Sequence, residues 1–494
     1  MPKQFDLIVI GSGAGMNVAA RAAGHGMQVA IVDNGPLGGT CLNRGCIPSK
    51  VMLYPADVIR TIQEAHAVGV HATVEAVDFE KIMARVWEIV LDGRREMAYG
   101  VAQTEDVTFF NADGAFVDAH TLQVGDERIE ADTIVIAAGA RPLIPPIEGL
   151  EAIGYLNSAT VFDLETPPES LIIVGGGYIA AEFAHFFSAI GVQVTVVGRN
   201  PRLVPEEEPE ISEVLQRKMA EYCQVYTGYE AVRAERAGDL KAITAIKRTG
   251  DAEQDAESHP SNTKTFTAQE VLIATGRRSN ADILQPERAG IETIRGGWIK
   301  TDPYLQTSQE NVWALGDARG RYMFRHTANY EAEMVWTNAF TEHRHAVDEH
   351  AVPHAVFTHP QIGSVGLTEA QAQTQAQAQA GHGVLVGIKR YYDTAKGFAM
   401  AEETGFVKVV VENETGRILG AHVIGPHAAI LVQQIVYVMN SQEGNYLPLA
   451  RAQTIHPALS EVVIGALGNL RPAGEHAGHH HHHHQDAHGH QDNE

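Results

Sequence analysis

The chain has 494 residues, of which 44% are hydrophobic, so two to four domains with sizeable cores are expected. Its 61 acidic and 37 basic residues give a net charge of −24, which disfavours nucleic acids and anionic membranes as partners. No apolar run reaches the roughly 20 residues that a membrane span needs. The first apolar stretch runs into glycines rather than a cleavage site, so we expect a cytoplasmic protein without a signal peptide.

Two stretches of the chain, about 160 residues apart, share the pattern of a strand, a glycine turn, a helix and a second strand. Their elements are expected at residues 5–10, 17–24, 28–32, 170–174, 178–190 and 193–197. One such unit is a common accident of sequence, whereas two in this order are more specific. The pattern predicts two dinucleotide-binding units built around parallel strands.

The first unit has glycines where a dinucleotide phosphate would approach the backbone. Gly11, Gly13 and Gly15 follow the first strand. Asp33 ends the second strand, where a carboxylate bonds a ribose hydroxyl. Met16 takes the last glycine position of the fingerprint, so the packing of helix on strand must tolerate a larger residue there.

The second unit has Gly175 and Gly177, with Ala180 in the last position of the fingerprint. A carboxylate after the following strand would favour NADH. Arg199 and Arg202 stand in that segment instead, and guanidinium groups suit the 2′-phosphate of NADPH. The sequence therefore predicts a preference for NADPH.

Strand-then-glycine segments end at Gly139 and Gly276, and each is expected to close one of the two units and start a crossing. A polar stretch over 250–265 is expected to be a loop, and an Ala/Gln-rich stretch over 369–381 a helix. From residue 352 the pattern is that of an α+β domain. Its strands and helices are expected at residues 407–411, 418–424, 429–440 and 458–467.

Two of the three cysteines, Cys41 and Cys46, lie close together among glycines and need a chemical explanation. Residues five apart in an ideal helix have Cα atoms roughly 8 to 9 Å apart. A disulfide needs about 4.4 to 6.8 Å. A bridge therefore requires a distorted turn, which Gly45 and Pro48 can supply. A strained bridge is easily reduced, which suits a catalytic disulfide, while Cys223 is interpreted as an ordinary semi-buried cysteine.

His456 and Glu461 lie near the end of the chain. A histidine beside a thiol can hold it as a thiolate and exchange protons with a substrate sulfur, and a glutamate can orient its ring. The same residues also fit an ordinary turn before a helix. Residues 471–494 include the run His479–His484 and are expected to be disordered. No metal site is predicted, apart from adventitious binding by this run.

These motifs, in this order, resemble the pyridine nucleotide–disulfide oxidoreductase family over roughly residues 5–470. Residues 38–50 and 456–461 are similar to segments of dihydrolipoyl dehydrogenases and mycothione reductases. The resemblance implies an α/β protein with two Rossmann-like dinucleotide-binding domains and a C-terminal α+β dimerisation domain. It assigns 1–149 and 277–347 to FAD binding, 150–276 to NAD(P) binding, 348–470 to the subunit interface and 471–494 to a tail.

The resemblance also implies roles for the residues beside the flavin. Cys41 is expected to meet the substrate, and Cys46 to contact the flavin as a charge-transfer thiolate. Lys50 and Glu182 resemble the ion pair beside the reactive nitrogen of the flavin.

Further roles follow from the same resemblance. Tyr178 resembles the lid over the nicotinamide pocket, and Asp317 the residue that bonds the ribityl chain of FAD. His456 and Glu461 resemble the acid–base pair, supplied by the other subunit of a homodimer with shared active sites. One FAD per subunit is expected, with NADP or NAD as co-substrate.

The first hypothesis is a dihydrolipoyl dehydrogenase-like flavoenzyme that passes electrons between NAD(P)H and a small disulfide or dithiol through Cys41 and Cys46. Alternatives are an NADPH-dependent reductase of a low-molecular-weight disulfide, of the mycothione type, and a mercuric-reductase-like enzyme. The last uses a C-terminal cysteine pair, and no cysteine follows Cys223. Two further classes are a metal-binding protein acting through its histidines and an inactive flavoprotein. The set of Cys41, Cys46 and His456 disfavours the inactive flavoprotein.

Overall fold

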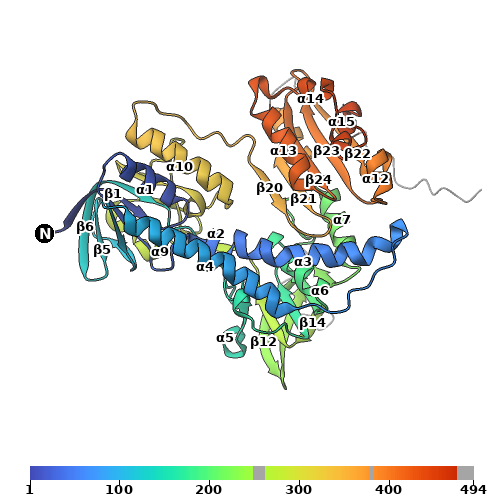
Figure 1. Ribbon diagram of the computed structural model, residues 1–494, viewed down its shortest axis with the longest axis horizontal. Coiled ribbons are helices and arrows are strands. Elements are labelled where there is room, and N and C mark those ends of the chain that lie inside the picture. The colour runs from blue at the N-terminus through green and yellow to red at the C-terminus, as the bar shows by residue number, and fades with distance from the viewer. Residues whose placement is uncertain (249–261, 379–382, 475–494) are drawn as a thin grey trace, which may run out of the picture. The chain divides into compact units, whose positions relative to one another are not determined.

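The computed structural model describes residues 1–248, 262–378 and 383–474 (Figure 1). It divides into two compact units, residues 1–362 and 363–494. Most of the loop expected over 250–265, the end of the helix expected over 369–381 and nearly all of the histidine-rich tail lie outside the described residues.

The first unit opens with a seven-stranded sheet. Its strands are β1 (Lys3–Ile10), β2 (Val29–Val32), β3 (Val107–Phe110), β4 (Gly114–Phe116), β5 (Thr121–Val124), β6 (Glu127–Ile136) and β19 (Val312–Ala314). They are ordered β3-β2-β1-β6-β5-β4, with β19 also paired to β6. The pairs of β1 with β2 and β6, and of β6 with β19, are parallel. β19, which comes from a much later part of the chain, thus completes the first sheet.

A second sheet repeats this parallel core. Its strands are β8 (Leu156–Asn157), β9 (Ser170–Val174), β10 (Gln193–Gly198), β11 (Gln224–Thr227) and β15 (Glu270–Ile273), in the order β11-β10-β9-β15-β8. In each sheet, the strand before the glycine motif lies between the strand after the following helix and a later parallel strand. The two predicted Rossmann-like domains are confirmed.

Helices cover these sheets and connect them. The main helices of the first unit are α1 (Gly15–Gly24), α2 (Gly39–Arg44), α3 (Cys46–Glu64), α4 (Phe79–Gln103), α6 (Tyr178–Ala189), α7 (Pro209–Met219) and α10 (Arg325–Phe340), with short turns α5 (Leu150–Ile153) and α9 (Ala281–Leu284). The long helices α3 and α4 pack side by side (Figure 1). Sequence periodicity indicates α1 and α6 but not α3, α4 or α10.

Small antiparallel sheets complete the first unit. They consist of β12 (Tyr229–Ala237), β13 (Leu240–Lys247) and β14 (Thr263–Ala268), of β7 (Ala140–Pro142) with β16 (Arg277–Ser279), and of β17 (Thr293–Ile294) with β18 (Trp298–Ile299); β20 (Pro353–Val356) ends the unit. β14 begins at Thr263, so the last residues of the expected 250–265 loop belong to a strand. They pair with β13, which a polar sequence does not reveal.

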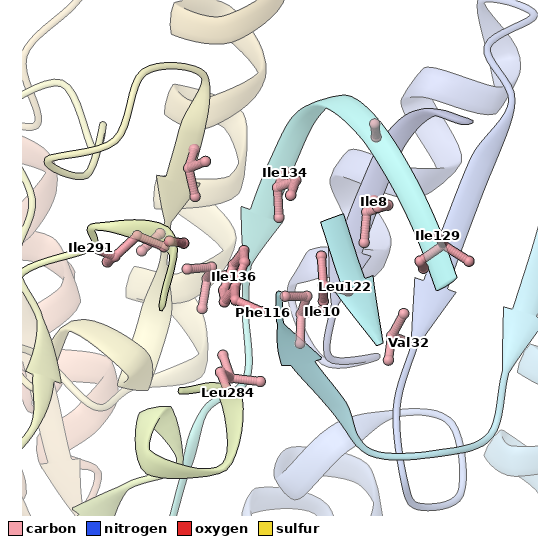
Figure 2. Close-up of a cluster of buried hydrophobic side chains, with 14 of the residues drawn as sticks. Ile8, Ile10, Val32, Phe116, Leu122, Ile129, Ile134, Ile136, Leu284 and Ile291 are labelled. Carbon is pink, nitrogen blue, oxygen red and sulfur yellow. The ribbon is translucent and has the colours of Figure 1, made fainter. Parts of the chain in front are cut away.

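Alternate residues of β1 enter two different cores. Leu7 and Val9 pack with apolar residues of α1 and α10, whereas Ile8 and Ile10 face the opposite side of the sheet. Figure 2 shows this second core, in which Phe116 lies among the isoleucines. Because both faces are covered, the strand is apolar throughout rather than alternating.

The start of α1 resolves the role of Met16. The ideal Cβ of an alanine at Gly15 would lie 2.7 Å from the Val9 side chain and 2.9 Å from that of Ala137. Met16 is partly buried and packs against the core on this face. Gly15 therefore provides the close approach of helix to strand that we had expected at position 16.

The second unit is an antiparallel sheet with helices. Its elements are β21 (Ile362–Gly366), α11 (Glu369–Ala378), β22 (Val384–Arg390), α12 (Ala395–Ala399), β23 (Phe406–Glu412), β24 (Ile418–Ile424), α13 (Ala428–Met439), α14 (Leu447–Arg451), α15 (Ser460–Gly468) and β25 (Arg471–Pro472). Its strands run in the order β21-β24-β23-β22-β25. The last helix begins at Ser460 and not at Ala458, because residues 456–459 form its lead-in turn.

Truncation of Phe116 tests the core in Figure 2. Phe116 is fully buried, with 0% of its surface exposed, so Phe116→Ala should lower the free energy of unfolding by about 3 to 5 kcal/mol. Tyr99→Ala is the matched control, because Tyr99 is 69% exposed and its loss should cost no more than about 0.5 kcal/mol. Urea unfolding of the three proteins measures both values, and equal losses for the two variants would contradict this view of the core.

Candidate active site

The two cysteines of the first unit flank a helix break. α2 ends at Arg44 and α3 begins at Cys46, with Gly45 between them. An ideal Cβ at Gly45 would lie only 2.8 Å from the carbonyl oxygen of Thr40, so a larger residue would disrupt the turn. The distorted turn expected at Gly45 is present. Pro48 lies within the first turn of α3, where a missing N–H leaves no helical bond unmade, and is not part of the break.

The two cysteines differ in how readily they lose a proton. Cys41 and Cys46 are thiols that hydrogen-bond to each other. This hydrogen bond and the nearby Lys50 ammonium lower the pKa of Cys46 to about 7, although burial opposes them. The same hydrogen bond, together with burial, raises the pKa of Cys41. Of the two sulfurs, Cys46 is therefore the one that becomes a thiolate.

Lys50 is held by a buried carboxylate from another domain. Its Nζ lies 2.9 and 2.7 Å from the two oxygens of Glu182 on α6. The backbone N–H of Phe357 donates to the same carboxylate at 3.0 Å, and Nζ lies 4.7 Å from the Phe357 ring centroid. The predicted ion pair is thus formed. Phe357 was missed because its contact spans 175 residues and involves a backbone group.

Tyr178 and Asp317 lie in the same neighbourhood. Burial raises the pKa of Tyr178 to about 12, and the charges acting on its hydroxyl include those of Arg277, Asp317, Glu182 and Cys46. Burial also raises the pKa of Asp317, which pairs with Arg277 at 3.4 Å. The fold therefore gathers predicted residues from three distant segments around the thiolate, and Arg277 joins them from a fourth.

Close contacts with neighbouring backbone require glycine at the first position of each glycine motif. Gly11 has φ +103°, and a Cβ there would lie 2.2 Å from the carbonyl oxygen of Ala137. Gly175 has φ +143°, and a Cβ there would lie 2.2 Å from the carbonyl oxygen of Ala274. Both loops thus bend around a neighbouring strand in the same way, as a phosphate-binding turn requires.

Asp33 fastens the first glycine loop. Its Oδ2 accepts hydrogen bonds from the backbone N–H and hydroxyl of Ser12, at 2.7 and 2.6 Å. A Cβ at Gly39 would lie 2.8 Å from the Cα of Gly13, so the start of α2 rests directly on this loop. A glycine loop and a carboxylate beside the redox turn fit the diphosphate and the adenosine ribose of FAD.

The two Rossmann-like domains contain an equivalent hydrogen bond, which allows their residue positions to be matched. The first glycine of each motif donates its N–H to a strand carbonyl, that of Val32 at 2.8 Å and that of Val197 at 2.9 Å. The residue that follows is Asp33 in the first domain and Gly198 in the second. The second domain therefore has no carboxylate at the position where the first has Asp33.

Arg199 and Arg202 follow Gly198 in the loop after β10. Within the described residues, neither guanidinium forms a hydrogen bond or ion pair with the protein, and Arg199 is exposed. The carbonyl oxygen of Arg202 lies 3.9 Å from the ideal Cβ position of Gly176, so this loop lies against the second glycine motif. Both arginines are thus on the loop beside the second glycine motif.

Gly139 and Gly276 mark the crossings between the two domains. Gly139 has φ +67° and Gly276 has φ +116°, and each immediately precedes a strand. Those strands, β7 and β16, pair with each other in antiparallel fashion. The two predicted crossings therefore run together as one two-stranded connection.

His456 and Glu461 form a pair in the second unit. His456 Nδ1 lies 2.8 Å from Glu461 Oε1, and the N–H of Ala458 donates to Oε2 at 3.1 Å. The hydrogen bond with His456 lowers the pKa of Glu461, which therefore stays ionised. The His456 side chain is 71% exposed, so its Nε2 can meet a partner outside this unit.

Asn43 and Arg94 are structural residues that sequence reasoning missed. The Asn43 amide donates to the carbonyls of Pro36, Leu37 and Gly39, which shapes the turn before the cysteines. Arg94 Nε donates to Asn43 Oδ1 at 2.6 Å. An asparagine among glycines is typical of side chains that bond to nearby backbone, and that signal was available.

The described residues contain neither a metal-binding cluster nor a membrane-spanning helix. No cluster of three or more His, Cys, Asp or Glu side chains in this part of the chain is placed to hold a metal ion. No helix in it has both the length and the apolar character needed to cross a membrane. The histidine run over 479–484 is outside these residues.

Comparisons with known proteins agree with this geometry. The sequence matches the pyridine nucleotide-disulphide oxidoreductase family over residues 5–332 and the dimerisation domain of that family over residues 352–467. It is 37% identical to mycothione reductase of Mycobacterium tuberculosis over 482 residues, covering 94% of this chain and 99% of the relative.

Two further relatives cover nearly the whole chain. Dihydrolipoyl dehydrogenase 3 of Haloarcula marismortui is 32% identical over 484 residues, with 95% of this chain and 97% of the relative covered. The Cu(II) complex of the flavoprotein disulfide reductase RclA from Escherichia coli superimposes with a TM-score of 0.81 at 26% identity, over 95% of this chain and 99% of that one. The chain therefore belongs to the pyridine nucleotide-disulphide oxidoreductase family and is an FAD-dependent disulfide oxidoreductase with a dimerisation domain.

Proposed function

We propose that this flavoenzyme is an NADPH-dependent reductase of a low-molecular-weight disulfide. The observation that carries the proposal is the replacement of the ribose-binding carboxylate by Gly198, followed by Arg199 and Arg202. A glycine leaves room for a 2′-phosphate, and guanidinium groups bind phosphate oxygens strongly. Similarity to a protein named mycothione reductase supports a small disulfide as the substrate.

The domain roles follow from the sheets. We assign residues 1–149 and 277–347 to FAD binding, because β19 pairs with β6 and residues from both segments share one core (Figure 2). We assign residues 150–276 to NADPH binding, because their strands form the second sheet. Residues 348–470 contain the dimerisation domain, and the cytoplasmic location stays a prediction.

Bound FAD supplies the redox chemistry, since a flavin accepts hydride from a nicotinamide and passes two electrons to a disulfide. Gly11, Gly13 and Asp33 would hold its dinucleotide part, and Asp317 its ribityl chain. The Lys50–Glu182 pair places a fixed ammonium beside Cys46, which stabilises negative charge on that sulfur. Tyr178, at the first turn of α6, would cover the nicotinamide pocket.

The reduced cysteine pair then exchanges with the substrate. Cys41 gives up its proton, and its sulfur attacks one substrate sulfur, so that a mixed disulfide forms and the other substrate sulfur leaves as a thiolate. The Cys46 thiolate next attacks the Cys41 sulfur, which releases the second substrate thiolate and restores the Cys41–Cys46 disulfide. Cys46 is suited to the internal step because its lowered pKa makes it the more readily ionised of the two thiols.

His456 is assigned to the proton transfers. It accepts the proton from Cys41 and donates it to the departing substrate sulfur, while Glu461 fixes its Nδ1 and leaves Nε2 for the reaction. We propose that His456 acts on the cysteine pair of the other subunit in a homodimer, so that each active site is shared.

The second candidate is a dihydrolipoyl dehydrogenase, and the similarity to such an enzyme of Haloarcula marismortui supports it. Steady-state turnover distinguishes the two. NADPH and NADH are each combined with mycothione, glutathione disulfide and lipoamide, and NAD with dihydrolipoamide. Reduction of one small disulfide with NADPH supports the proposal, whereas fast NAD-linked oxidation of dihydrolipoamide would replace it by the second candidate.

Charge removal after β10 tests the nicotinamide assignment. Arg199→Ala combined with Arg202→Ala should lower kcat/KM for NADPH at least about tenfold, because a hydrogen bond to a charged group contributes roughly 1.5 to 3 kcal/mol. The efficiency with NADH should change little. Arg217→Ala is the matched control, since Arg217 is an exposed arginine of the same domain. Equal losses with both nucleotides would show that the two arginines do not read the phosphate.

Substitution of Cys46 tests the charge-transfer role. Cys46→Ser should abolish the long-wavelength thiolate–flavin absorbance of the reduced enzyme and leave FAD bound. In the wild type the band should fade as the pH falls, with a midpoint at about 7 or below, because protonation removes the thiolate whose pKa is lowered. Cys223→Ser is the control and should keep the band. Persistence of the band in Cys46→Ser would contradict the assignment.

Substitution of His456 tests the acid–base role. His456→Ala should lower disulfide turnover by about 10² to 10⁴ while flavin reduction by NADPH stays nearly intact. Glu461→Gln keeps a hydrogen-bond acceptor and should lose less. His427→Asn is a control in the same unit, because asparagine tolerates the left-handed backbone there. Rapid-mixing absorbance separates the two half-reactions, and a matching loss in flavin reduction would count against this role.

A further inference from the structure

Helix α3 is weakened just behind the redox turn. Cys46 begins the helix and Lys50 lies in its second turn, but Pro55 follows within the same helix. Proline cannot donate the helical N–H bond to the carbonyl of Val51, and its ring crowds that carbonyl. Each half of α3 therefore needs its own attachment to the neighbouring domain.

A second buried pair attaches α3 to α6 beyond the proline. His185 lies one turn after Glu182 on α6, and 0% of its side chain is exposed. Its Nε2 lies 2.9 Å from Oδ1 of Asp57 on α3. Its Nδ1 is buried and has no hydrogen-bond partner among the described residues. The single ring proton is therefore on Nε2 and is donated to the Asp57 carboxylate.

Burial keeps this ring neutral. Desolvation lowers the pKa of His185, and the nearby Asp57 carboxylate does not fully offset it. A second proton would place a buried N–H without an acceptor on Nδ1, which is costly. The pair is therefore a fixed hydrogen bond at neutral pH rather than a titrating switch.

Other side chains near the His185 ring also hold the part of α3 that follows Pro55. The ring of His359 stacks on it at 6.2 Å and bonds to Glu64 at 2.8 Å. Arg60 donates to Ser188 at 2.7 Å and lies 3.8 Å from the ring centroid of Tyr222. The charged and titratable side chains that act on the ring are Asp57 and Arg60 of α3 and His359 of the segment before Pro360.

These attachments connect the second half of α3 with the active site. The segment that carries His359 also carries Phe357, whose N–H holds Glu182. Glu182 holds Lys50, and Lys50 in turn lowers the pKa of Cys46. A displacement of α3 at Asp57 would therefore act on the redox turn, which begins about three helical turns away at Cys46.

We propose that His185 and Asp57 form a positioning pair for the reduced dithiol. By holding α3 against α6 behind Pro55, they keep Lys50 on Glu182 and the ammonium within reach of Cys46, which helps to keep this sulfur anionic. Neither residue touches the reacting atoms. The inference rests on the charge-transfer role assigned to Cys46 under the proposed function.

The test uses the reduced holoenzyme and two substitutions at one site. Asp57 is 32% exposed, so both variants should fold. Asp57→Ala removes the acceptor, and the pH midpoint of the thiolate–flavin absorbance should rise by about 0.5 to 1 unit because Lys50 is less well placed. Turnover should fall about three- to tenfold with KM for the disulfide unchanged. Asp57→Asn keeps an acceptor oxygen and should restore the wild-type midpoint.

Two further proteins make the outcome decisive. His185→Leu should reproduce the shift of Asp57→Ala, and if it does not fold the two Asp57 variants decide alone. Ile129→Val is the control for stability, because this buried residue of the first sheet lies far from α6 and should leave the midpoint unchanged. An unchanged midpoint and turnover in Asp57→Ala would refute the positioning role. A wild type without the band at any pH would instead refute the role of Cys46.

Discussion

The hydrogen bond between the two cysteines, made across the break at Gly45, is the interaction on which the site depends. It exists because a glycine ends α2 against Thr40 and lets α3 start at Cys46. It leaves one sulfur protonated and the other anionic, and Lys50 reinforces that asymmetry. Substrate exchange and internal exchange can then use different sulfurs of one pair. The Lys50–Glu182 ion pair and the attachments of α3 to α6 serve to keep this arrangement in place.

Duplication of the Rossmann-like fold explains how one chain handles two dinucleotides. The first glycine of each motif makes the same backbone hydrogen bond, so the two ribose-binding positions can be compared directly. The first has Asp33, which is fastened to Ser12, and the second has Gly198 with arginines behind it. The difference lies where the second strand of each domain ends, and both domains keep the same parallel core. Under the proposed function, it determines which ribose fits.

Local patterns in the sequence predicted the parts of the molecule that local chemistry determines. Apolar runs followed by glycines located both parallel cores, and the spacing of Cys41, Gly45 and Cys46 required the distorted turn that the structure contains. The sequence did not reveal α3, because Pro55 interrupts its helical signal. It also did not reveal the hydrogen bond from the Phe357 N–H to Glu182, because this bond joins distant segments. Gly15 replaced position 16 as the point of close packing, because that contact depends on Val9 of β1 and on Ala137, which directly follows β6.

In the proposed mechanism, the Cys41–Cys46 pair stores electrons beside the flavin. Anaerobic reductive titration of the holoenzyme, followed by its absorbance and by counting of free thiols, tests this storage. We expect the first two electrons per subunit to generate two new thiols and a long-wavelength band, while the main absorbance of oxidised flavin persists. Bleaching of the flavin by the first two electrons, with no new thiols, would contradict it.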